Sequence, residues 1–298
     1  MKRRKIVLMY NPVSGHARFK YRLDEITEIC QKNGAILIPY RTEKENPELP
    51  DFLREVDPDG IIAAGGDGTL HHSIDLLLRN GISKPVGVIG SGTSNDFATY
   101  LGVHNRLKEY VGKIAAGTAS IREIDAGCAN GHYFINVASA GMLTDVPHKV
   151  NTKLKNTFGK LAYYVSGLKE VAKFKPLPVT IETEGKIYHE DTFLFVIINS
   201  DAVGSFRNVA GGVAVDDGLL DLLLVRWGSP AELMSLTASL AGGKGIGGAK
   251  NVLHLQSDRF VITTDSGGAV ESDLDGEIGP GFPLEITAKQ RAVRFFCL

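Results

Sequence analysis

The sequence has few cysteines and no excess charge of either sign. Cys30, Cys128 and Cys297 are an odd, scattered set that suits neither a disulfide framework nor a zinc site. This usage fits a reducing cytosol, so we expect a cytoplasmic protein. Lys plus Arg number 33 against 34 for Asp plus Glu. This balance argues against bulk nucleic-acid binding and directs attention to local clusters of charge.

Long hydrophobic runs are also absent. The basic start, Met1 to Lys5, is followed by an apolar run that stops at Asn11, which is too short for a secretory signal. No stretch approaches the roughly 18 to 20 apolar residues that span a bilayer. We therefore expect a soluble protein that touches membranes from one side at most.

A glycine-rich loop follows a short apolar run at residues 61–70, with the sequence IIAAGGDGTL. The run predicts a buried strand. Glycines at 65, 66 and 68 lack the Cβ atoms that would keep a bulky anion from the backbone N–H groups, which favours a phosphate loop. Asp67 would repel phosphate unless it holds a cation or accepts a proton, so it indicates chemistry on the phosphate. Alternatively, Asp67 caps a helix over Leu70 to Leu78.

Two more loops of this kind follow predicted strands. Ile6 to Tyr10 leads into Asn11–Gly15, and Pro85 to Ile89 leads into Gly90–Phe97. The intervening pattern predicts helices over 23–30 and 49–56 and a strand over 35–40. In such an alternating α/β order the strand ends meet at one edge of a parallel sheet, so we expect the loops to share an anion there.

The pattern changes near residues 120–128 from alternating helices and strands to many strands at short spacing. This predicts an α/β nucleotide-binding domain over 1–124, to which the C-terminal tail could return, and an all-β sandwich domain over 125–298, with few long helices. The strands expected in the second half are 133–137, 179–184, 186–198, 219–226, 252–255, 259–264, 284–288 and 292–296.

The stretch Lys149 to Lys175 carries seven lysines against the single acid Glu170. Its apolar residues predict a helix with one apolar face. The helix could meet anionic lipid head groups or could pack on the sandwich with a solvated lysine face. The sequence leaves both open.

With these motifs in place, the chain resembles the diacylglycerol kinase catalytic-domain family of bacterial lipid kinases, which also look like sphingosine and ceramide kinases. The matching motifs, in the order of the family, are NPVSG at 11–15, GGDGT at 65–69, GTSNDFA at 92–98 and DGE at 275–277. GGDGT alone is shared with NAD kinases and is related to the phosphofructokinase loop. The combination is much more specific and covers nearly the whole chain.

The resemblance implies an NAD kinase-like fold with ATP in the cleft between two domains and Mg²⁺ at the phosphates through Asp67. The phosphates would lie on Asn11–Gly15 and on the glycine loop as far as His72. The implied nucleotide contacts are Asn11, Pro12, Val13, Ser14, Gly15, Thr42, Gly66, Asp67, Gly68, Thr69, Leu70, His71, His72, Thr93, Asn95 and Asp96.

Glu277 matches the catalytic base of the family, which would take the proton from the lipid hydroxyl. An alcohol is a poor nucleophile at neutral pH, so a carboxylate base and a divalent cation are reasonable requirements for phosphoryl transfer. The alternative for Asp275-Gly276 is a simple hairpin turn, since Asp-Gly is a common tight-turn pair. Three acids within five residues, Asp273, Asp275 and Glu277, favour function.

Residues 214–221 resemble a structural magnesium site of the family. Asp217 would supply a carboxylate, and Ala214 and Leu219 would supply backbone carbonyls. The alternative is an Asp-Gly turn before a strand.

The chain departs from the family pattern in two places. His71-His72 stands where many members have Asn-Glu, and Thr99 replaces an arginine that follows the NDFA motif. Neither histidine has a metal-ligand partner at a readable spacing, so we expect both on the helix surface rather than at a zinc site.

These observations favour an ATP-dependent kinase that phosphorylates a lipid hydroxyl at a membrane surface, with diacylglycerol converted to phosphatidic acid. A kinase of a soluble cofactor such as NAD and a catalytically silent lipid- or nucleotide-binding protein are the alternatives. No nucleic-acid partner is expected, and a homodimer is left open.

Overall fold

The computed structural model describes seven stretches of the chain: 3–12, 22–43, 45–91, 95–141, 176–203, 206–266 and 270–298. They form two compact units. The first unit contains the chain up to Ile124 together with Arg291–Leu298, and the second unit is Asp125–Gln290. The lysine-rich stretch at 149–175 lies outside the described residues.

The first unit is built on a parallel sheet. Its strands are β1 (Lys5–Tyr10), β2 (Ile36–Arg41), β3 (Gly60–Gly65) and β4 (Val86–Gly90), in the order β2-β1-β3-β4. The end of β17 (Leu284–Cys297) adds a further parallel strand, with Phe295 opposite Val86. β3 is buried along its whole length, as expected for a central strand of a sheet covered on both faces.

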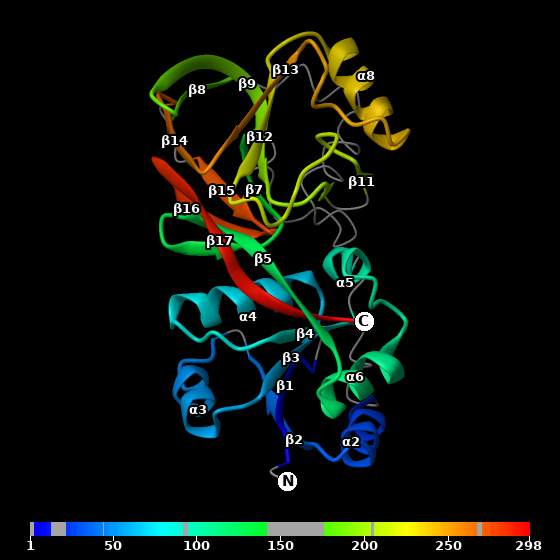
Figure 1. The fold of residues 1–298 in the computed structure, drawn as a ribbon. Helices are drawn as coiled ribbons and strands as arrows, with labels where there is room; N and C mark the ends of the chain where they lie inside the picture. The colour runs from blue at the N-terminus through cyan, green and yellow to red at the C-terminus, as the bar shows by residue number, and fades with distance from the viewer. Residues whose placement is uncertain are drawn as a thin grey trace. The chain divides into compact units, whose positions relative to one another are not determined.

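Helices cover both faces of this sheet. They are α2 (Leu23–Lys32), α3 (Leu49–Val56), α4 (Asp67–Arg79), α5 (Asp96–Tyr100) and α6 (Leu107–Ala116). Figure 1 shows α2 and α6 together on one side and α3 on the other. The buried hydroxyl of Tyr110 on α6 donates to Phe296 O at 2.8 Å and accepts from Val88 N at 3.3 Å. Tyr110 therefore fixes the last residues of the chain beside β4.

The second unit is a mainly antiparallel β-sandwich-like domain. Its strands are the second part of β5 (Ser120–Ala129), β6 (His132–Phe134), β7 (Val137–Gly141), β8 (Leu177–Thr183), β9 (Lys186–Ile198), β10 (Ala202–Val203), β11 (Phe206–Arg207), β12 (Leu220–Arg226), β13 (Val252–Ser257), β14 (Arg259–Thr264), β15 (Glu271–Leu274), β16 (Glu277–Gly281) and the first part of β17. β9 is central and pairs with β7, β8 and β12.

Two hydrophobic clusters lie on opposite faces of β9. Phe195 and Ile197 belong to one cluster, whereas Val196 and Ile198 belong to the other. This alternation follows from the two-residue repeat of a strand. Helix α8 (Pro230–Ala241) covers the second cluster with its leucines and starts at a capping box.

The expected fold class is confirmed, and many elements lie where the sequence placed them. The predicted strands over 186–198 and 259–264 agree with the observed bounds of β9 and β14. The two strands expected at 284–288 and 292–296 are wrong as separate elements. They form one strand, β17, in which Arg291 has a φ of 50°. No helix in the described ranges is long and apolar enough to cross a bilayer.

Candidate active site

The loops after four parallel strands meet at the carboxyl edge of the first sheet. Asn11 N, which follows β1, donates to Ala64 O at 3.1 Å, and Ser91 N, which follows β4, donates to Gly65 O at 2.8 Å. Thr42 N, after β2, donates to Tyr10 O at 2.9 Å. The predicted convergence is thus confirmed for the described residues. Val13, Ser14, Gly15 and Thr93 lie outside them.

Helix α4 begins at this edge, directly after β3. Gly66 is its N-cap, with extended dihedral angles, and Asp67 is the first helical residue. The interpretation of Asp67 as the cap is therefore wrong. The N–H groups of Thr69 and Leu70 both bond to Gly66 O, whereas the earliest N–H groups of a helix have no intrahelical acceptor. The positive end of the helix and its first N–H groups, which have no intrahelical acceptor, suit the binding of a phosphate.

A small, open hollow lies at the start of α4. Gly65, Gly66 and Asp67 line it from the β3–α4 turn, and Gly90 and Asn95 line it from the segment after β4. Asn95 is 6% exposed and has a φ of 51°, a conformation that asparagine tolerates better than most residues. The hollow combines backbone donors with one carboxylate, which is a suitable environment for a phosphate together with a cation.

Two of the glycines make room for side chains of the protein itself. A Cβ on Gly65 would lie 2.3 Å from Thr69 Oγ1, and one on Gly90 would lie 2.8 Å from Asn95 Cβ. Their immediate role is thus close packing at the start of α4 and α5. The prediction that Gly65 is required to clear space for an anion misses this tighter constraint.

His71 and His72 differ in their environments. His71 is 7% exposed, so its expected position on the helix surface is wrong, whereas His72 is exposed as expected. Position 71 falls on the apolar side of α4 with Leu70 and Ile74. Thr99 is the other residue that departs from the family pattern. Its Oγ1 donates to Asn95 O, at the start of α5, at 3.0 Å.

Glu277 begins β16, immediately after a tight turn in the second unit. Asp275 and Gly276 form the turn between β15 and β16, with φ values of 52° and 92°. This is the hairpin that the alternative interpretation anticipated. Gly276 N donates to Asp273 Oδ1 at 2.8 Å, and the Asp275 carboxylate accepts backbone N–H groups. Two of the three acids therefore build the turn.

The predicted metal site at residues 214–219 lies in the loop before β12. Asp217 is exposed, and its Oδ1 accepts Leu219 N at 3.0 Å, which is the arrangement of an Asx turn. Gly218 N donates to Asp125 Oδ2 at 2.6 Å. One carboxylate and two carbonyls remain compatible with a hard cation. The stretches that the structure describes hold no group of three or more His, Cys, Asp or Glu placed to bind a metal.

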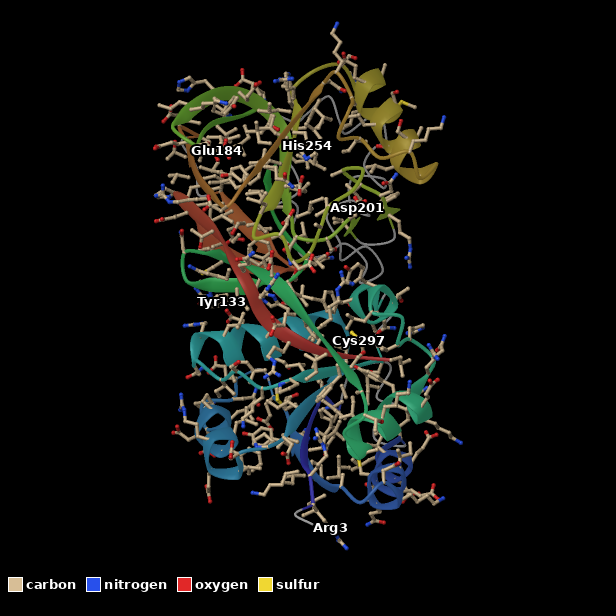
Figure 2. The ribbon with its side chains drawn as sticks, viewed as in Figure 1. Arg3, Tyr133, Glu184, Asp201, His254 and Cys297 are labelled. Atoms are coloured by element: carbon tan, nitrogen blue, oxygen red, sulfur yellow. The ribbon has the colours of Figure 1, made fainter. Side chains whose placement is uncertain are left out.

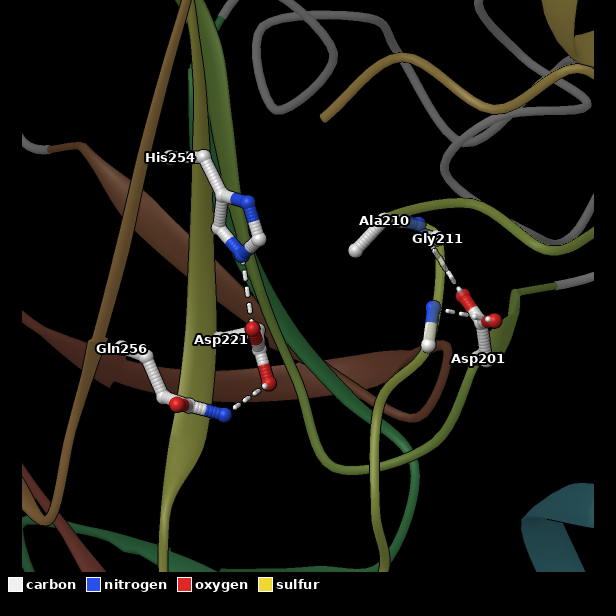
Figure 3. Close-up of polar contacts among 7 residues, drawn as sticks. Asp201, Ala210, Gly211, Asp221, His254 and Gln256 are labelled. Atoms are coloured by element: carbon white, nitrogen blue, oxygen red, sulfur yellow. Dashed lines mark hydrogen bonds and ion pairs between the residues drawn. The ribbon is translucent and has the colours of Figure 1, made fainter. Parts of the chain in front are cut away.

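A polar cluster that the sequence did not reveal lies in the second unit. The Asp221 carboxylate is 4% exposed, and its oxygens lie 2.6 Å from His254 Nε2 and 3.4 Å from Gln256 Nε2. Figure 3 shows these contacts across β12 and β13, and it also shows Asp201 bonded to Ala210 N. Asp201 and His254 are also labelled in Figure 2. Because Asp221 and His254 lie far apart in the sequence, only the strand register pairs them.

Comparison with known proteins identifies the family. The family model for the diacylglycerol kinase catalytic domain matches residues 5–129, and the model described as the YegS C-terminal NAD kinase beta sandwich-like domain matches residues 136–297. A protein of Bacillus subtilis (strain 168) named diacylglycerol kinase is 32% identical over 98% of this chain and 95% of its own length. The chain belongs to the diacylglycerol kinase family.

Other members of the diacylglycerol kinase family agree with this assignment. A diacylglycerol kinase of Staphylococcus aureus (strain MRSA252) is 28% identical over 99% of this chain and 92% of its own length. A crystal structure of a diacylglycerol kinase from Bacillus anthracis str. Sterne shares the fold, with a TM-score of 0.80 and 24% identity over 100% of this chain and 98% of that one. A second structure from that organism gives a TM-score of 0.83 at 25% identity, over 100% of this chain and 96% of that one.

Proposed function

We propose that this protein transfers the γ-phosphoryl group of ATP to the hydroxyl of diacylglycerol and so forms phosphatidic acid. The names of its relatives support the substrate class, since proteins from two genera that match it over nearly their whole length are named diacylglycerol kinase. The N-terminus of α4, at Gly66 and Asp67, supports the binding of the nucleotide phosphates. Because the acceptor is a membrane lipid, the proposal includes transient contact with a bilayer surface.

The carboxyl edge of the first sheet is the proposed phosphate site. The N-terminus of α4 provides backbone donors and a positive partial charge, and the segment around Asn11 lies beside it. Asp67 would hold Mg²⁺, which offsets the negative charge of the phosphates when bound. Without a cation, the Asp67 carboxylate would repel the nucleotide, so its position in the hollow is the observation on which the proposal mainly rests.

Glu277 is the proposed general base. In the reaction, the lipid hydroxyl gives its proton to the Glu277 carboxylate while its oxygen bonds to the γ-phosphorus. The bond from that phosphorus to the bridging oxygen breaks, and ADP leaves. Asp273 and Asp275 are bonded within the hairpin and its neighbouring segment, so they are less suited to accept this proton.

The test is to incubate the protein with ATP labelled at the γ-phosphate, Mg²⁺, a total lipid extract and NAD. We expect label in the organic phase, as phosphatidic acid. Label on NAD would instead support a cofactor kinase. Nucleotide binding without transfer to either acceptor would identify a silent binding protein and contradict the proposal.

A further inference from the structure

The hairpin that carries Glu277 has little backbone support of its own. β16 lies at the end of the strand order and pairs with β15, and the register of β15 with β7 covers Asp273 and Leu274. The pairing of β15 with β16 is also irregular. Strand pairing therefore provides few of the contacts that hold this edge hairpin to the sheet. Something else must fix Glu277 if it is to act as a base.

Asp275 supplies a strong attachment from within the turn. Its Oδ2 accepts Ile135 N at 2.9 Å, and its Oδ1 accepts Asn136 N at 3.0 Å and Val137 N at 2.8 Å. Its own N–H donates to Val137 O at 2.8 Å. Bonds from N–H groups to a carboxylate are stronger than bonds between neutral groups. The turn is thus clamped to a segment about 140 residues earlier in the chain.

Asn199 donates hydrogen bonds to backbone carbonyl groups of the same segment. Asn199 is fully buried at the end of β9, and its N–H donates to Asn136 O at 3.0 Å. Its side-chain Nδ2 donates to Ile135 O at 3.0 Å and to Asp125 O at 2.8 Å. The hydroxyl of Ser200 also donates to the side chain of Asn136.

These bonds account for the whole backbone of residues 135–137. Each of the three N–H groups bonds to the Asp275 carboxylate, and each of the three carbonyls accepts a bond from Asp275 N or from Asn199. The segment therefore forms a hydrogen-bonded bridge from the end of the central strand β9 to the turn of the hairpin. Glu277 is two residues beyond Asp275, so its backbone is fixed through this bridge.

We propose that Asp275 and Asn199 are positioning residues for Glu277, an inference that rests on the proposed function of Glu277 as base. A misplacement of about 1 Å in a catalytic group can lower the rate by roughly a hundredfold. Loss of the clamp should therefore reduce turnover while leaving nucleotide binding intact, because the bridge lies within the second unit and the proposed phosphate site in the first.

The experiment compares Asp275→Asn with Glu271→Gln, which removes an exposed carboxylate from the same hairpin. For Asp275→Asn we expect kcat to fall at least tenfold with little change in the KM for ATP. We also expect faster amide hydrogen exchange at residues 135–137 and 271–281. Glu271→Gln should change neither quantity by more than about twofold. Ser200→Ala, which removes one hydroxyl from the bridge, provides a milder variant with a smaller decrease in kcat if Asp275→Asn does not fold.

The outcomes separate this inference from the proposed function. If Glu277→Gln abolishes transfer but Asp275→Asn, or Ser200→Ala in its place, keeps the kcat and exchange rates of the wild type, the positioning role is wrong and the base remains. If Glu277→Gln retains full transfer, the proposed function of Glu277 fails first. A decrease in kcat for Asp275→Asn without faster exchange at 135–137 would also contradict the clamp.

Discussion

Asp275 and Asn199 together bond to every backbone polar group of residues 135–137, although 76 positions separate them in the sequence. The DG pair of the DGE motif is thus explained without assigning it to chemistry. Asp275 shapes the turn and clamps it, Gly276 adopts the required positive φ, and Glu277 is presented at the first position of the next strand. Asp275 and Glu277 therefore differ in role, and substitutions at the two positions should have different effects.

Asp67→Asn should lower transfer by at least roughly a hundredfold, because the neutral amide is a much poorer ligand for a divalent cation than the carboxylate. The helix should remain folded, since Asp67 does not cap it. Steady-state kinetics with circular dichroism checks this expectation. Asp51→Asn, which changes an exposed carboxylate on α3, is the control. Normal turnover in Asp67→Asn would remove this residue from the mechanism.

Gly65→Ala should destabilise the first unit by about 1–3 kcal/mol, as overpacking typically does. The new methyl would lie 2.3 Å from Thr69 Oγ1 and 2.4 Å from Thr69 Cβ, so the start of α4 must shift. Urea denaturation gives the free energy of unfolding, and ATP titration should show weaker binding. Gly248→Ala, with no atom within 4 Å of the added Cβ, is the matched control. Equal stability of the two variants would argue against close packing of Thr69 on Gly65 at this turn.

His254→Ala should destabilise the second unit by roughly 1–3 kcal/mol, because it leaves the buried Asp221 carboxylate without its nearest side-chain donor. Nucleotide binding should be unaffected. The measurement is thermal unfolding of the full chain, with His132→Ala as the control because His132 is exposed. If both variants unfold at the same temperature as the wild type, the contact between His254 and Asp221 contributes no stability.

The buried thiol of Cys30 should cause a loss of stability at alkaline pH. Burial raises the pKa of the Cys30 thiol to about 11, above its usual value of 9.0, because the thiolate is disfavoured in the core. The unfolded chain therefore loses this proton first, and stability decreases as pH rises from about 9 towards 11. The difference between the two pKa values lowers the free energy of unfolding by about 2 kcal/mol at pH 11.

The check on this prediction is the difference in unfolding free energy between the wild type and Cys30→Ala, measured from pH 8 to pH 11. Other groups titrate in this range in both proteins, so only the difference reports on Cys30. We expect the alanine variant to lose less stability at alkaline pH. Parallel curves for the two proteins would show that the thiol does not titrate on unfolding.

Local sequence patterns were sufficient for the sheet and for the meeting of its loops. Parallel strands that alternate with helices place their carboxyl ends together, so Asn11, Gly66 and Ser91 could be expected at one edge. The environment of His71 was not predictable in this way, because burial depends on which side of α4 packs inward. The clamp by Asp275 and the contact of Asp221 with His254 depend on long-range pairing, which no local pattern encodes. The nucleotide contacts proposed for the loops stay predictions.

The most direct test of the central claim is phosphoryl transfer from labelled ATP to vesicles that contain diacylglycerol, measured for the wild type and for Glu277→Gln at equal protein concentration. The account predicts labelled phosphatidic acid with the wild type and at least a hundredfold less with Glu277→Gln, while both proteins bind ATP equally. Absence of labelled lipid with the wild type, or equal rates for the two proteins, would contradict it.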